Sequence, residues 1–193
     1  MNKIDIYNIL VNKENSIPEK ISEHVKLITF KDTNDKEIFI EEKTYLQYEK
    51  LKKYIYEEER TVIGIGNAYR TAERQKEMHQ QFILWYGKEY ADAIVAPVNH
   101  SEHQTGLAID LKIYFEGEGF ISNNRNFEKT RKVFEAKIHK HLYKFGFILR
   151  YPNNKENITK YPYEPWHIRY VGEKIAKKIY DEDITFEEYK SLI

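Results

Sequence analysis

The amino-acid sequence predicts an α+β fold, because helical and strand-like segments follow one another without a regular βαβ alternation. In some segments the apolar residues recur every three to four positions, and in others they occupy every second position. No internal repeat, low-complexity tract or clear linker divides the chain. Its 193 residues are the usual length of one domain, so we expect residues 1–193 to form a single domain.

Short apolar runs predict the strands. In 107–113, every second residue is a large apolar one, and Ala108, Asp110 and Lys112 stand between them. This alternation is typical of a strand with one buried face. The run at 166–171 alternates in the same way and places His167 and Arg169 together on one face. Further strand-like runs are found at 27–30, 38–40, 61–66 and 147–149.

Helical spacing predicts two amphipathic helices. The first covers 41–58, and its apolar stripe is formed by Leu46, Leu51, Tyr54 and Ile55. The second covers 131–145, where Phe134, Ile138 and Leu142 are spaced four residues apart, and it ends at Gly146.

Capping signals predict two more helices. Thr71 is a suitable N-cap for a helix that runs to about Tyr86 and ends at Gly87, and its Met78 and Phe82 are expected to be core residues. A capping box at 185–188 opens a last short helix. Residues 116–126 are rich in Gly and Asn, so we expect a loop there.

The composition excludes several classes of protein. The chain holds 31 Lys and Arg against 31 Asp and Glu, so it lacks the basic excess of a nucleic-acid-binding protein. With 41% hydrophobic and 15% aromatic residues it is too apolar for a disordered chain. The absence of Cys excludes disulfides, thiolate zinc sites and a Cys nucleophile.

The sequence also bears on localisation. No stretch approaches 18 consecutive apolar residues, and charges are scattered through the first residues where a signal peptide would be apolar. We therefore expect a cytoplasmic protein, or a secreted one if an export signal precedes this sequence. No membrane span, nucleic acid or protein partner is expected.

A His and an Asp accompany the strand predicted at 107–113. His103 lies just before the strand, Asp110 lies within it, and Gly106 allows the chain to turn between them. Both side chains are good zinc ligands, and a carboxylate in an apolar strand is costly to bury unless it is paired or metal-bound. The alternative is an Asp on the solvent side of an edge strand and a His in a surface loop.

A second group of polar residues opens the last predicted strand. His103, Asp110 and His167 together would supply the three protein ligands of a catalytic zinc, which keeps a fourth position open for water. Glu164, three residues before His167, is then free to accept a proton from that water. The alternative is a capped strand end with a hydrogen-bonded His.

An arginine follows the strand predicted at 61–66. The planar guanidinium of Arg70 can bind a carboxylate or a developing oxyanion through two hydrogen bonds. The alternative is a surface Arg at the start of a helix.

These segments resemble the VanY- and VanXY-type D-alanyl-D-alanine carboxypeptidases of the LAS zinc-metallopeptidase superfamily. Residues 101–110 match the family signature Ser-x-His-x-x-Gly-x-Ala-x-Asp, and blocks at 147–152 and 164–172 match as well. The resemblance extends from Leu10 to Tyr189. It implies a small central antiparallel sheet with flanking helices.

The resemblance assigns roles to individual residues. It implies that His103, Asp110 and His167 hold one zinc ion and that Glu164 is the catalytic base. Arg70 would polarise the scissile carbonyl or its oxyanion. The pocket for the terminal residue of the peptide would be lined by Gln75, Ser101, Tyr151 and Trp166.

Two departures from the family pattern lie near these residues. The family usually has Ser-Gly-Tyr-Arg where this chain has Asn67-Ala68-Tyr69-Arg70, so Ala68 would be strained if that position requires a positive φ. Val98-Asn99 replaces the usual Pro-Gly, and Asn tolerates the left-handed region.

The implied activity is hydrolysis of the terminal D-Ala from peptidoglycan precursor peptides that end in D-Ala-D-Ala, alone or together with D,D-dipeptidase activity. One alternative is an L,D-carboxypeptidase that trims tetrapeptide stems. Another, from a different class, is a non-catalytic zinc-containing binding module. The loop at 116–126 is expected to influence substrate length, because it follows the Asp110 strand directly.

Overall fold

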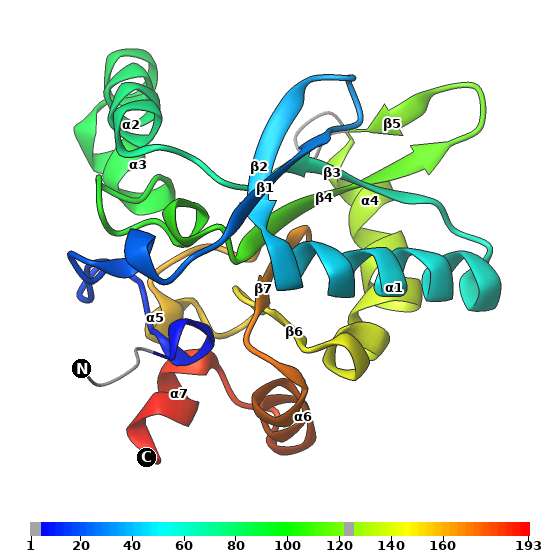
Figure 1. Cartoon of the computed structure of the whole chain (residues 1–193). Coiled ribbons are helices and arrows are strands. Elements are labelled where there is room, and N and C mark those ends of the chain that lie inside the picture. The colour runs from blue at the N-terminus through cyan, green and yellow to red at the C-terminus, as the bar shows by residue number, and fades with distance from the viewer. Residues whose placement is uncertain (1–4, 122–125) are drawn as a thin grey trace.

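Helices and antiparallel strands combine in one α+β architecture, as predicted (Figure 1). The structure is a computed structural model, and it describes residues 5–121 and 126–193. The strands are β1 (Leu27–Lys31), β2 (Glu37–Glu41), β3 (Ile63–Asn67), β4 (Ala108–Phe115), β5 (Gly119–Ile121), β6 (Phe147–Leu149) and β7 (His167–Tyr170). The α-helices are α1 (Glu42–Glu59), α2 (Ala72–Tyr86), α3 (Lys88–Ile94), α4 (Phe127–Val133), α5 (Glu156–Thr159), α6 (Glu173–Glu182) and α7 (Phe186–Ser191). Short 3₁₀ or π-helical segments are η1 (Ile6–Asn8), η2 (Ile21–Glu23), η3 (Glu102–Thr105), η4 (Phe134–Ile138) and η5 (His139–Phe145).

The central sheet is antiparallel throughout its described strands. Its order is β3-β4-β7-β6, and β5 pairs with the far end of β4. Asp110 on β4 is opposite His167 on β7 and, on the other side, opposite Asn67 on β3. β1 and β2 form a separate two-stranded ribbon.

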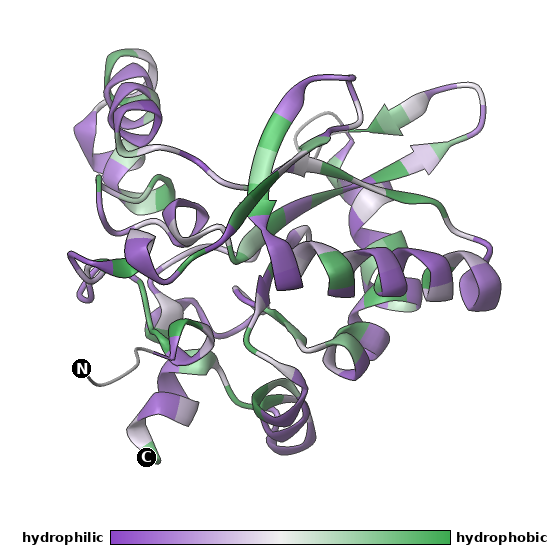
Figure 2. Cartoon of the chain, viewed as in Figure 1, coloured by the Kyte–Doolittle hydropathy of each residue, from purple (hydrophilic) through white to green (hydrophobic). Residues whose placement is uncertain are grey.

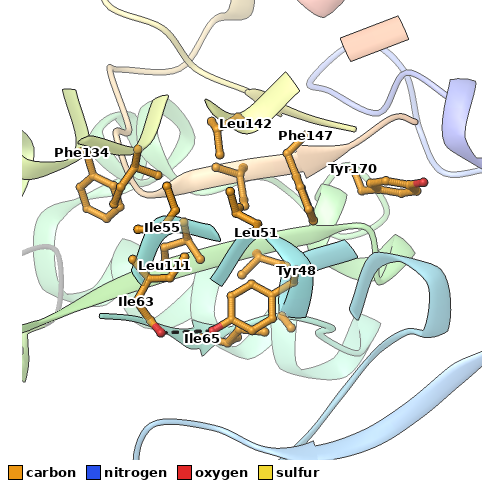
Figure 3. Packing of buried hydrophobic residues seen from close by; sticks show 14 of the residues in the cluster. Tyr48, Leu51, Ile55, Ile63, Ile65, Leu111, Phe134, Leu142, Phe147 and Tyr170 are labelled. Atoms are coloured by element: carbon orange, nitrogen blue, oxygen red, sulfur yellow. Dashed lines mark hydrogen bonds between the residues drawn. The ribbon is translucent and has the colours of Figure 1, made fainter. Parts of the chain in front are cut away.

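The alternation of side chains divides the sheet into an apolar and a polar face. Ile109 and Leu111 of β4 and Ile168 of β7 are buried in the main hydrophobic core, and Asp110 and His167 point to the opposite face. Helix α1 runs alongside β3 and β4 over the apolar face (Figure 1). Figure 3 shows this core, where Leu51 and Ile55 of α1 lie among side chains from the sheet and from η4 and η5. The polar face is thereby left for the functional site.

The helix predicted at 41–58 is present as α1, but the prediction that Leu46 belongs to its buried apolar stripe is wrong. Leu51 and Ile55 are fully buried, whereas Leu46 is 56% exposed. Tyr48 takes a place in the core instead, and its hydroxyl donates a hydrogen bond to the Ile63 carbonyl over 3.4 Å (Figure 3). Figure 2 shows the resulting alternation of hydrophilic and hydrophobic positions along α1.

Several predicted boundaries are confirmed by local hydrogen bonds. The Thr71 side chain accepts from the backbone N–H of Arg74, and α2 ends at Gly87. Thr185 and Glu188 form the capping box that opens α7. These caps satisfy backbone groups that a helix end leaves without partners.

Other expectations need correction. The segment predicted as a loop at 116–126 contains the strand β5; residues 122–125 lie outside the described part of the chain. The helix predicted at 131–145 begins earlier, at Phe127, and changes from α to π and then to 3₁₀ geometry before Gly146. Helices α3 and α6 were not predicted, although α6 has an amphipathic pattern that buries Ala176 and Ile179.

Among the described residues, no helix is long and apolar enough to cross a membrane.

The two leucines of α1 provide a test of this packing. Replacing Leu51 by Ala should lower the free energy of unfolding by about 2–5 kcal/mol, because the change leaves a cavity in the core. The matched change Leu46→Ala should alter it by no more than about 0.5 kcal/mol. Urea unfolding followed by circular dichroism measures both, and similar losses for the two variants would contradict the packing described.

Candidate functional site

Three neighbouring strands place polar side chains in a row on the sheet face opposite α1. Asn67, Asp110 and His167 lie at matched register positions of β3, β4 and β7. Residues directly opposite in adjacent antiparallel strands have neighbouring side chains. The Asn67 amide donates a 3.1 Å hydrogen bond to Oδ2 of Asp110, which helps to orient that carboxylate.

His103 reaches the same place from the short segment η3. Gly106 follows it with φ +73°, and the turn at Gly106 returns the chain into β4. Nδ1 of His103 lies 2.7 Å from the Ala68 carbonyl oxygen. Because a carbonyl only accepts hydrogen bonds, Nδ1 carries the proton and Nε2 is left as the lone-pair donor. Ala68 does not have a positive φ, so the strain considered for it does not arise, and Asn99 does adopt the left-handed region at φ +66°.

The predicted metal ligands come together. One ligand atom from each of His103, Asp110 and His167 lies within 4.8 Å of the other two. Nε2 of His103 is 3.3 Å from Oδ2 of Asp110, and Nδ1 of His167 is 3.2 Å from Oδ1 of the same carboxylate. The two imidazole rings meet edge to face, with their centres 4.9 Å apart.

The donor set of this cluster fits a bound cation. Burial lowers the pKa of His103, so its Nε2 is an acceptor that faces another acceptor, Oδ2 of Asp110. Oδ1 of Asp110 is buried and makes no hydrogen bond within the described part of the chain. Buried polar atoms in native proteins nearly always have partners, and a metal ion would satisfy these. Two imidazoles and one carboxylate are a common zinc-binding set that leaves one position open.

Glu164 stands beside the cluster without belonging to it. Its Oε2 is 3.5 Å from Nδ1 of His167. Its backbone N–H donates to the Tyr151 carbonyl, and Nε2 of His139 donates to the carbonyl of Pro165 next in the chain. Burial raises the pKa of the Glu164 carboxyl to about 7, although His167 acts in the opposite direction. A carboxyl of this kind can exchange a proton near neutral pH.

Arg70 is held at the edge of the cluster by Gln75. A guanidinium N–H of Arg70 donates a 2.7 Å hydrogen bond to Oε1 of Gln75, and the Gln75 amide donates to the Ala96 carbonyl over 2.6 Å. Gln75 is fully buried, so its amide fixes the direction of Arg70. Arg70 itself lines the cleft that contains the cluster.

One cleft of about 670 Å³ contains the cluster and the other predicted site residues. Its walls include Arg70, Gln75, Ser101, Tyr151, Glu164 and Trp166. Beyond them the cleft extends along α2 and α3, where it is bordered by Met78, Phe82, Tyr86, Tyr90 and Ile94. The expectation that Met78 and Phe82 are core residues is wrong, because both face this cleft. No described residue of the segment 116–126 lines it.

A buried ion network behind the cluster was not predicted. The Glu102 carboxylate is bound through Oε1 by Arg150 at 2.8 Å and by Arg169 at 3.0 Å. Arg150 also forms two hydrogen bonds with Glu187 of α7. Burial opposes the ionisation of Glu102, but the charges of Arg150 and Arg169 keep its pKa below the ordinary value. The sequence signal was a pair of arginines within apolar strand segments, where a charge needs a partner.

Comparison with known proteins gives a consistent result. The family model for the VanY D-alanyl-D-alanine carboxypeptidases matches residues 37–173. A D-alanyl-D-alanine carboxypeptidase of Enterococcus faecalis (strain ATCC 700802 / V583) is 32% identical over 193 residues, covering 94% of this chain and 64% of the relative. The bifunctional D-Ala-D-Ala dipeptidase and carboxypeptidase VanXYC of Enterococcus gallinarum is 30% identical over 181 residues, covering 93% of this chain and 91% of the relative.

This chain spans only part of some relatives. The protein YodJ of Bacillus subtilis (strain 168) is 46% identical over 124 residues, which make up 64% of this chain and 43% of YodJ. The chain therefore covers less than two thirds of both YodJ and the Enterococcus faecalis relative.

Two solved structures are similar over most of the chain. The LdcB LD-carboxypeptidase superposes with a TM-score of 0.79 at 35% identity, covering 94% of this chain and 84% of LdcB. A variant of the D,D-pentapeptidase VanY from a VanB-type resistance cassette, in complex with Zn(II), superposes with a TM-score of 0.73 at 31% identity. That superposition covers 95% of this chain and 98% of the VanY chain.

Metal content tests the cluster directly. His167→Ala should lose most bound zinc, because it removes one of three ligand atoms. His141→Ala is the control, since His141 is also largely buried but lies outside the cluster, next to Glu59. Elemental analysis after dialysis should show about one zinc per chain in the wild type and the control. Equal zinc in all three proteins would remove His167 from the ligand set.

Proposed function

This chain belongs to the VanY family of D-alanyl-D-alanine carboxypeptidases, and on that premise we propose that it hydrolyses peptidoglycan precursor peptides ending in D-Ala-D-Ala. The bond cleaved is the terminal peptide bond, and the product is free D-Ala. The substrates in the names of its relatives support this choice of peptide.

One observation carries the proposal. The candidate ligands His103, Asp110 and His167, the acid–base candidate Glu164 and the cation Arg70 converge in a single cleft. A hydrolase of an uncharged peptide bond needs a water-activating centre, a proton carrier and a group that stabilises the developing oxyanion. The three-residue cluster, Glu164 and Arg70 would each meet one of these requirements.

We propose zinc as the cofactor, one ion held by His103, Asp110 and His167. When bound, zinc supplies a Lewis acid that lowers the pKa of water and polarises a peptide carbonyl. The donor set fits this ion, and the VanY neighbour was solved in complex with Zn(II).

The protein side chains then divide the reaction between them. Glu164 accepts a proton from water as the water oxygen attacks the carbonyl carbon of the penultimate D-Ala. Arg70 faces the negative charge that develops on the carbonyl oxygen. As the C–N bond breaks, Glu164 returns the proton to the leaving amine. The terminal carboxylate docks near Ser101 and Gln75, and Tyr151 and Trp166 form the sides of the pocket.

The length of the cleft favours a peptide longer than a dipeptide. D-Ala-D-Ala fills the part next to the cluster, and the aromatic border on α2 and α3 remains for preceding residues. Apolar and aromatic walls bind such segments by removing surface from water. D,D-dipeptidase activity is therefore expected to be the weaker of the two activities. A cytoplasmic location stays a prediction.

A panel of three ligands tests substrate and bond. Zinc-loaded protein incubated with pentapeptide, tetrapeptide and dipeptide should release D-Ala fastest from the D-Ala-D-Ala-ending pentapeptide, as measured by mass spectrometry. Chelation should abolish release, and added zinc should restore it. Faster cleavage of the tetrapeptide would show an L,D-carboxypeptidase instead, and no cleavage of any peptide would contradict catalysis.

The role of Glu164 is tested by an isosteric change. Glu164→Gln should lower kcat by about 10²–10⁴-fold, because the amide cannot accept the proton, while zinc content stays unchanged. Glu156→Gln, on the exposed face of α5, is the control and should behave as the wild type. Wild-type turnover in the Glu164 variant would rule out this residue as the base.

A further inference from the structure

Glu102 combines complete burial with one unused carboxylate oxygen. Its side chain is 0% exposed, and Oε1 accepts from both Arg150 and Arg169. Oε2 has no hydrogen-bond partner in the described part of the chain and lies 3.6 Å from Nε2 of His167. That ring nitrogen is also buried and without a hydrogen-bond partner there. A buried acceptor and a buried ring nitrogen therefore face each other, slightly beyond hydrogen-bond distance.

The other nitrogen of His167 points to the candidate metal position. Nδ1 lies 3.2 Å from Oδ1 of Asp110 and 3.5 Å from Oε2 of Glu164. A ring nitrogen binds a metal only through its lone pair, so His167 can serve as a ligand only when the remaining proton is on Nε2. The side chain that faces this proton is Glu102.

The orientation of Glu102 is fixed from behind. Guanidinium groups only donate hydrogen bonds, so the two arginines hold Oε1 on their side and leave Oε2 directed toward His167. Arg150 is itself fixed by Glu187 of α7, which also accepts a hydrogen bond from the Asn12 amide. Glu102 therefore has one orientation, set by contacts that do not involve the metal site.

We propose that Glu102 is a positioning residue that accepts a hydrogen bond from Nε2–H of His167 and so presents Nδ1 to the metal. The inference rests on the proposed function only in taking His167 as a metal ligand. Carboxylates that bond the second nitrogen of a ligand His fix its tautomer and ring orientation in other metal sites. Here the carboxylate is the immediate sequence neighbour of a different ligand, His103, so one short segment would serve two ligands.

The isosteric change Glu102→Gln tests the proposal. The amide oxygen must stay with the two arginines, which places the NH₂ group against Nε2 of His167. This donor favours the tautomer with the proton on Nδ1, which cannot bind a metal. Zinc affinity should fall by about 10–100-fold, measured by competition with a chromophoric chelator in alkaline buffer, where protons no longer compete for Nδ1.

Glu187→Gln is the matched control. It also removes one charge from the buried network, but Glu187 contacts Arg150 and not His167. Its zinc affinity should stay within about twofold of the wild type. Equal losses in the two variants would show that the network acts only through stability, and unchanged affinity in Glu102→Gln would also overturn the proposal.

Two further measurements keep the test decisive if Glu102→Gln folds poorly. Glu102→Asp keeps the charge for both arginines but withdraws the carboxylate from His167, so its zinc affinity should be intermediate. In the zinc-loaded wild type, NMR should show a slowly exchanging Nε2–H proton on His167, and this protection should be lost in both Glu102 variants. Protection retained in both would contradict the proposed bond. These readouts need no substrate, so a failure to release D-Ala would leave them interpretable.

Discussion

A half-buried carboxylate in the middle of the central sheet is the constraint on which the candidate site depends. Asp110 lies on β4, between Asn67 of β3 and His167 of β7, and its ionised form is costly to bury without positive partners. The imidazoles of His103 and His167 both reach it. Burial lowers the pKa of His103, so that ring offers a lone pair, whereas the pKa of His167 is raised to about 9, because the hydrogen bonds and charges of Asp110 and Glu102 outweigh its burial. Oδ1 of Asp110 has no hydrogen-bond partner in the described part of the chain, and a cation bound among the three side chains would satisfy it.

The buried ion network gives this centre a rigid support. Glu102 and Glu187 balance Arg150 and Arg169 in charge, so the network places no net charge in the interior. Breaking a buried pair by removing one partner is strongly destabilising, because it leaves an unpaired charge. The network also joins distant parts of the chain, since Arg169 bonds the carbonyls of Ile6 and Ile9 and Arg150 reaches α7. The network thus binds the segment at 6–9 through Arg169 of β7, and helix α7 through Arg150, which follows β6.

The proposed reacting groups of the cleft and its aromatic border come from different elements. The candidate metal ligands come from η3, β4 and β7, and Arg70 and Glu164 lie in the segments that follow β3 and precede β7. Helices α2 and α3 supply the aromatic border through Phe82, Tyr86 and Tyr90. The similar structures include both an LD-carboxypeptidase and a D,D-pentapeptidase, so this fold accommodates more than one terminal bond. Differences in substrate would then arise in the walls and leave the reacting groups unchanged.

The local features of this protein could be predicted from its sequence. The alternation along the strands predicts that Asp110 and His167 lie on the face opposite their apolar neighbours. Thr71, Gly87 and Thr185 predict where helices begin or end. Both signals depend only on residues that are close in the chain. The exposure of Leu46, the position of Phe82 beside the cleft and the contact of Glu102 with His167 became evident from the folded chain. Those outcomes depend on strand register and on which faces meet across the fold. Such long-range contacts leave no periodic trace in a single sequence, whereas a buried arginine or aspartate leaves only the indication that it requires a partner.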